Sequence, residues 1–209
     1  MDRGRAGWRR RMPLVAALGA GLGGPLASAT EPPAPLLDLV WVDLTGMSPA
    51  VVGLAYSEVG DLLAPLGVRV VSRLESPGVA FRPGQAIVIL RRSNPNPAHT
   101  GRSVGGTVTE AAATSRTLWV FPACVASGLG LTLEHQLLWS SGQRREFARA
   151  LAVVVAHELQ HLAGAHHSPG GLMSGFLCPS QLRDRHLELD TRLAPGFRAA
   201  LAARTQPEP

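Results

Sequence analysis

Hydrophobic residues are spaced along the chain in two ways, and each spacing predicts a different kind of element. Short runs that are almost continuously apolar, or that alternate with polar residues, are typical of strands in a buried sheet. Between the first two runs, apolar residues from Val51 to Leu63 recur at helical spacing, and Ser48-Pro49 is a typical helix start. The predicted strands are 36–44, 68–74, 85–90, 104–109 and 117–121.

The second half of the chain is predicted to be mainly helical. A long helix is expected from Ser141 to Ala163, with an apolar stripe along one face and Gly164 at its end. After a stretch rich in Gly and Pro, Ser180 is expected to begin a last helix that continues to Leu193, with a further helical stretch left open after Pro195-Gly196. This order of elements indicates an α/β (or α+β) fold.

The first 29 residues have the pattern of an export signal. Basic residues crowd between Arg3 and Arg11, an apolar run follows to Leu26, and Ala27-Ser28-Ala29 is a small-residue cleavage pattern. We predict a signal peptide at 1–29, cleaved after Ala29, and a secreted or periplasmic protein. An uncleaved anchor, a start at Met12 and twin-arginine export are the alternatives, although the run is short for a membrane span.

The predicted mature chain has a simple organisation. A Pro-rich linker at 30–35 precedes one domain at 36–204, and a tail follows at 205–209. The 45% hydrophobic content suffices for one core. No membrane span is expected after cleavage, and the pattern makes no prediction about oligomeric state.

The basic net charge lies mostly in the signal segment. The whole chain has a formal net charge of +5, and residues 1–29 hold five Arg and one acid. The remainder has 20 − 5 = 15 basic residues against 15 − 1 = 14 acids, a net charge of +1. The net charge of the predicted mature chain therefore gives no electrostatic reason to expect a nucleic-acid partner.

The chain has two cysteines, Cys124 and Cys178, both in the part that would be exported. In an oxidising compartment they are candidates for one disulfide. The sequence leaves this pairing open, because it depends on the distance between the two Cα atoms.

The segment from His157 to His167 holds the candidate chemistry. His157 and His161 are four residues apart on a predicted helix, so both imidazoles can reach one zinc ion. Gly164 lets the chain leave the helix sharply, so that His167 can return to the metal as a third ligand. Three protein ligands leave one position open, as a catalytic zinc site requires.

Glu158 has a different predicted role from its histidine neighbours. It is too close in sequence to be a natural third ligand, but it is well placed to take a proton from a water at the metal. Three neutral imidazoles leave the charge of the ion uncompensated, so that it can activate this water and polarise a carbonyl. We therefore expect one catalytic Zn²⁺ and a peptide or protein substrate.

The string H-E-x-x-H-x-x-G-x-x-H from His157 to His167, followed by Gly171-Leu172-Met173-Ser174, resembles the metzincin clan of zinc peptidases. The resemblance implies a twisted, mostly parallel sheet with an antiparallel edge strand, then the zinc-binding helix, a Met-turn at Met173 beneath the metal, and a C-terminal helix. His167-Ser168 and the residues after it are most similar to matrixins. The chain lacks the cysteine cluster of archaemetzincins and a tyrosine after Met173, which astacin-like enzymes use.

Three hypotheses remain. The first is an exported zinc metalloendopeptidase. In the second, Glu188 or Asp190 is the third ligand, as in a thermolysin-like site. Separately, His166 is the alternative to His167 within the first hypothesis. The third is a catalytically silent, secreted, zinc-containing binding module, since a resemblance of fold does not establish activity.

Overall fold

The computed structural model describes residues 34–82, 84–92, 106–108, 117–175, 177–184, 187, 191 and 194–205, and the predicted signal peptide lies outside them. Residues 33–209 form one compact unit. The elements are β1 (Leu36–Asp43), α1 (Pro49–Leu63), the 3-10 helix η1 (Ala64–Leu66), β2 (Arg69–Glu75), β3 (Gln85–Leu90), β4 (Gly106–Val108), β5 (Thr117–Val120), α2 (Pro122–Gly128), the 3-10 helix η3 (Leu133–Leu138), α3 (Ser141–Leu162), α4 (Pro179–Arg183) and α5 (Ala194–Thr205).

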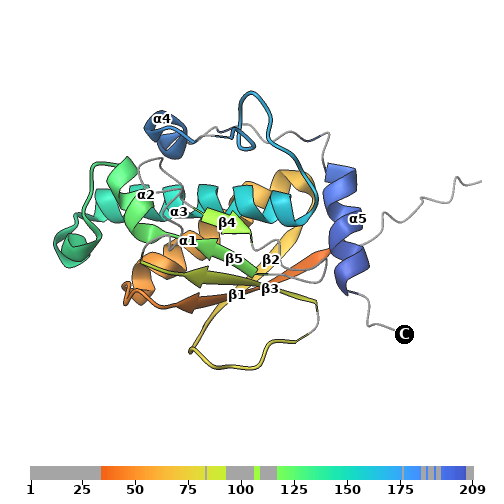
Figure 1. The fold of residues 1–209 in the computed structure, drawn as a ribbon, viewed down its shortest axis with the longest axis horizontal. Helices are drawn as coiled ribbons and strands as arrows, with labels where there is room; N and C mark the ends of the chain where they lie inside the picture. Colours follow the sequence, from red (N-terminus) through yellow and green to blue (C-terminus); the bar gives the residue numbers. More distant parts are fainter. Residues whose placement is uncertain are drawn as a thin grey trace, which may run out of the picture. The chain divides into compact units, whose positions relative to one another are not determined.

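Five strands form one sheet in the order β2-β1-β3-β5-β4 (Figure 1). The pairs β1–β2, β1–β3 and β3–β5 are parallel, while β4 pairs antiparallel with β5 at the edge. The sheet is thus mostly parallel with one antiparallel edge strand, as the resemblance implied. All five predicted strand ranges overlap an observed strand, although β2 ends one residue beyond the range 68–74 and β4 covers only three residues of the range 104–109.

Helices α1 and α3 pack on one face of the sheet, and their apolar residues meet those of the strands there in one core (Figure 1). Alternate residues of β1 face this core, and the largest of them, Trp41, lies against Tyr56 of α1. Helix α3 is buried on nearly every side, because each residue from Phe147 to Gln160 except Arg149 is buried. The helix that carries the candidate site is therefore held from several directions.

A capping box fixes the start of α3. The Ser140 Oγ accepts a hydrogen bond from the Gln143 backbone N–H, and the Gln143 Oε1 accepts one from the Ser140 N–H. Both interactions satisfy backbone donors that the first turn of a helix leaves unpaired. The predicted helix at 141–163 is observed to within one residue.

The predicted last helix from Ser180 to Leu193 is wrong. Helix α4 ends at Arg183, because Asp184 adopts an extended conformation with ψ of 118°. A separate helix, α5, begins at Ala194 and carries Pro195 in its first turn, where proline is tolerated.

Helices α2 and η3 were not predicted from the sequence. Within the described part of the chain, no helix has the length and apolar character that crossing a bilayer requires.

Cys124 lies on α2, and Cys178 lies at the start of α4. No disulfide joins them in this structure. Instead, the Cys178 Sγ lies 2.9 Å from the Ser180 Oγ. This hydrogen bond, with a second from the Gln181 backbone, lowers the pKa of the Cys178 thiol.

Candidate metal centre

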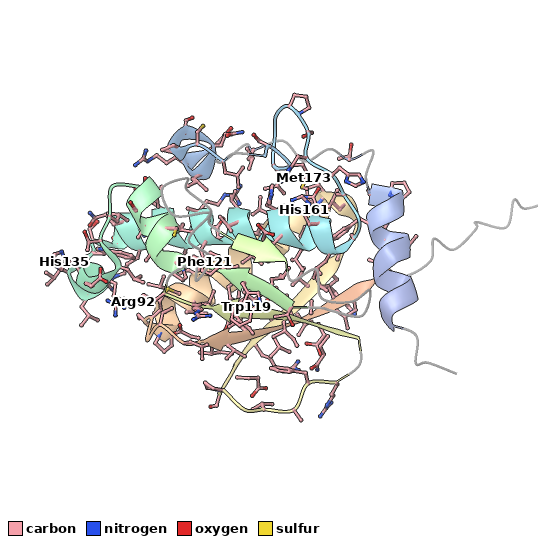
Figure 2. All side chains as sticks on the ribbon, viewed as in Figure 1. Arg92, Trp119, Phe121, His135, His161 and Met173 are labelled. Atoms are coloured by element: carbon pink, nitrogen blue, oxygen red, sulfur yellow. The ribbon has the colours of Figure 1, made fainter. Side chains whose placement is uncertain are left out.

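Three histidine side chains converge at the C-terminal end of α3. The Nε2 atom of His161 lies 3.0 Å from the Nε2 atom of His157 and 3.0 Å from that of His167. All three potential ligand atoms lie within 4.8 Å of one another. The structure therefore brings together the three residues that the sequence analysis proposed as metal ligands, and Figure 2 shows His161 of this group close to Met173.

The backbone turn that returns His167 to the helix is a Schellman motif. Gly164 has a φ of 85°, and its N–H donates to the His161 carbonyl. The Ala165 N–H donates to the Gln160 carbonyl. A left-handed residue followed by these two bonds ends a helix abruptly. A Cβ at Gly164 would meet no heavy atom within 4 Å, so the backbone angle alone requires the glycine.

Backbone carbonyls fix the orientation of two of the histidine rings. The Nδ1 of His161 lies 2.8 Å from the Ala165 oxygen, and the Nδ1 of His157 lies 2.7 Å from the Leu172 oxygen. A carbonyl oxygen only accepts hydrogen bonds, so each Nδ1 must carry the proton. In a neutral imidazole the Nε2 then presents a lone pair, as a metal ligand does.

Burial keeps these rings neutral. It lowers the pKa of His157 to about 4 and also lowers the pKa of His161. At neutral pH the two Nε2 lone pairs therefore face each other across 3.0 Å. This arrangement is repulsive unless a cation lies between them, because neither nitrogen can donate a proton to the other.

The donor set fits a zinc ion. Two nitrogens, each roughly 2.0–2.1 Å from a common ion at a tetrahedral angle, would lie about 3.3 Å apart, close to the observed separation of 3.0 Å. Neutral imidazoles are ordinary zinc ligands, and three of them leave one tetrahedral position for water or substrate.

A turn from Gly171 to Ser174 lies against this cluster. The Ser174 N–H donates to the Gly171 carbonyl, and the Ser168 N–H donates to the Met173 carbonyl. Leu172 and Met173 in the middle of the turn are both buried. Because the Leu172 carbonyl also accepts from His157, the turn directly orients one of the proposed ligands.

Glu158 follows His157 on α3 and is buried to the same degree. The two residues are 6% and 7% exposed. Burial raises the pKa of Glu158 to about 8 in the metal-free protein. At neutral pH the group is therefore mainly protonated without a metal, and a nearby cation would lower its pKa so that the carboxylate could accept a proton.

The structure also contains contacts that the sequence analysis missed. The Leu172 and Ala165 carbonyls are backbone groups, and no side-chain pattern marks them. Gly175 lies against the ring of His167, since a Cβ there would be 3.4 Å from its Nδ1. In the sequence, only the position of Gly175 two residues after Met173 could have indicated this contact.

The other candidate histidines do not join the cluster. His166 is exposed and outside the group, and His135 lies on η3 at the left edge of the view, apart from His161 (Figure 2). Glu188 and Asp190, the alternative third ligands, lie outside the described residues. Among the residues that the structure describes, the three histidines form the only group of this kind.

Gly164→Ala is expected to lower the free energy of unfolding by about 1–2 kcal/mol, the cost of placing a Cβ in the left-handed region. Gly53→Ala is the matched control, because Gly53 is also exposed and a Cβ there also meets nothing within 4 Å, but it lies inside α1. The control should stabilise the protein by about 0.5–1 kcal/mol. Urea unfolding with a chelator present measures both, and equal effects of the two variants would contradict the strain argument.

The fold is similar to that of a solved structure. The chain is similar to the crystal structure of archaemetzincin from Methanopyrus kandleri, with a TM-score of 0.57 and 13% sequence identity over 82% of this chain and 98% of that chain. At this identity the similarity shows the fold alone. At the level of sequence, no family model and no curated protein matches the chain. The similarity of fold does not establish an activity, which depends on the residues of the site.

Proposed function

We propose that this protein is a zinc-dependent endopeptidase of the metzincin type, acting on peptide or protein substrates. The observation that carries the proposal is the pair of neutral imidazoles of His157 and His161, whose lone pairs face each other at 3.0 Å. Glu158, the next residue after His157 on α3, is buried. The fold similarity to an archaemetzincin supports the same class. The matrixin-like subfamily stays a prediction.

His157, His161 and His167 would hold one zinc ion. When bound, zinc lowers the pKa of water and polarises a carbonyl. Glu158 accepts the proton of the attacking water and delivers it to the leaving amine. Its burial favours this role, because few waters of the bulk solvent compete for the carboxyl.

The turn from Gly171 to Ser174 would be the Met-turn of the metzincins. Its contribution here is positional, since Met173 is buried and the adjacent Leu172 carbonyl orients His157. We propose that Met173 supports the metal site from within the core and takes no chemical part. We also propose export, with a signal peptide at 1–29 and a secreted or periplasmic mature protein.

The second candidate function is a catalytically silent zinc-containing binding module. Glu158 argues against it, because a structural zinc site gives no reason to bury an ionisable carboxyl next to a ligand. The contact between the Nε2 atoms of His161 and His167 likewise supports His167 over an acidic third ligand.

Removal of the metal tests the proposal. Dialysis against a chelator should abolish cleavage of an unfolded protein substrate, and one equivalent of Zn²⁺ should restore it, whereas Mg²⁺ at the same concentration should not. Zinc content and cleavage are measured on the same samples. A protein that binds one zinc and cleaves nothing in a broad panel of substrates would favour the binding module, and a protein that binds no zinc would refute both hypotheses.

A further inference from the structure

Two adjacent leucines on η3 are unusually exposed. Leu137 is 78% exposed and Leu138 is 83% exposed, the highest values among the large apolar side chains that the structure describes. A single exposed leucine is ordinary on a protein surface. Two consecutive ones that leave most of their area in water need an explanation beyond packing.

The register of η3 holds these leucines outward. In a 3-10 helix, side chains three residues apart lie on the same side. Leu133 and Gln136 form the inward side: Leu133 is buried, the Gln136 Oε1 accepts the Ser48 N–H, and its Nε2 donates to the Gly46 carbonyl. Neither exposed leucine can turn inward without breaking these contacts.

The residues after the leucines are equally fixed. Trp139 is buried, with its ring 4.8 Å from the Phe147 ring. The Arg144 Nη2 donates to the Leu137 carbonyl. The backbone that carries the two leucines is therefore fixed, so that binding through them requires little additional ordering of the chain.

Two arginines, Arg92 and Arg144, contact residues of η3, and a third follows Arg144 in the sequence. Arg144 contacts the Leu137 backbone, and the exposed Arg145 follows it in the first turn of α3. Arg92 pairs with Glu134, which shares a side of η3 with Leu137. Three arginines against one glutamate leave a local formal charge of 3 − 1 = +2. Figure 2 shows Arg92 and His135 together at this end of the structure.

We propose that the leucine–arginine surface, made of Leu137, Leu138, Arg92, Arg144 and Arg145, binds a bilayer that contains anionic phospholipids. The leucines would insert at the level of the headgroups, and the guanidinium groups would contact lipid phosphates. A bilayer suits this surface better than a protein partner, because a stable protein interface buries about 800 Å² on each side. Two leucines offer far less apolar area.

The surface is separate from the candidate metal centre. It adjoins Ser141 at the start of α3, whereas His161 lies 161 − 141 = 20 residues further along the same helix. At about 1.5 Å per residue this is about 30 Å. Membrane binding would therefore leave the histidine cluster accessible, and variants of the surface should not alter zinc content.

Vesicle co-sedimentation tests the proposal. The chain from residue 30 is used, because residues 33–209 form a compact unit and the basic, apolar segment at 1–29 would itself bind vesicles. The vesicles are phosphatidylcholine alone, or equal parts phosphatidylcholine and phosphatidylglycerol. The protein should bind only the anionic vesicles, and the double variant Leu137→Ser/Leu138→Ser should lower its partition coefficient at least about tenfold.

Two further variants make the result decisive. Arg144→Gln/Arg145→Gln should weaken anionic binding about tenfold, whereas Leu54→Ser/Leu74→Ser, which changes leucines exposed elsewhere, should not. Equal binding to both vesicle types, or binding that the Leu137 and Leu138 double variant retains, overturns the proposal. Self-association of the wild type that this variant abolishes also overturns it, because the surface would then join two copies. Zinc content and peptide cleavage are read separately, so failure of the proposed function is distinguishable.

Discussion

Replacing Glu158 by glutamine is expected to lower kcat/KM for peptide hydrolysis by about 10²- to 10⁴-fold, with one zinc ion still bound per chain. Glutamine has nearly the same shape as glutamate, but it cannot accept the proton of the attacking water. The histidines keep their carbonyl partners in this variant, because Glu158 takes no part in their hydrogen bonds to the Leu172 and Ala165 oxygens. Metal content and steady-state cleavage of one peptide substrate are measured together.

The variant should remain folded, which makes the loss of activity interpretable. Burial raises the pKa of Glu158 to about 8, so holding the carboxyl charged in the folded protein is unfavourable, and a neutral amide removes this cost. Glu58→Gln on α1 is the control, since it also replaces a glutamate, one paired with Arg149, and should change kcat/KM less than about twofold. Activity in Glu158→Gln near the wild-type value would remove Glu158 from the mechanism.

The sheet and α3 could be predicted because their apolar periods are long and unbroken. Helix α3 adds a capping box at Ser140 and a glycine at its end, so that local and tertiary signals agree. The strand ranges were predicted for the same reason, except for the exact limits of β4. Long periodic segments carry more information than any single residue in them.

The short elements could not be predicted because their ends depend on tertiary contacts. Helix α4 has five residues, and its Arg183 bonds the Leu129 carbonyl and the Glu146 carboxylate on other elements. Nothing in the local sequence marks that anchor, so the apolar spacing beyond Arg183 was extrapolated into a longer helix. The 3-10 helix η3 was missed because its period of three does not match the helical or strand templates.

The same contrast applies to the candidate site. Its side chains follow a fixed spacing on one helix and one turn, which the sequence displays directly. The Ala165 and Leu172 carbonyls cannot be predicted in this way, because any residue could supply a backbone oxygen to these histidine rings.

The neighbouring histidines His166 and His167 allow a test of the third ligand with a built-in control. His167→Ala is expected to lower zinc affinity at least about 100-fold, since losing even an outer partner of a ligand costs about 10- to 100-fold. His166→Ala should leave it within about threefold, because His166 lies outside the converging group. Competition with a chromophoric chelator measures both affinities. Of the two neighbours, His167 is the one whose Nε2 lies 3.0 Å from that of His161. The opposite ranking would make His166 the ligand, and equal, unchanged affinities would point to a ligand elsewhere.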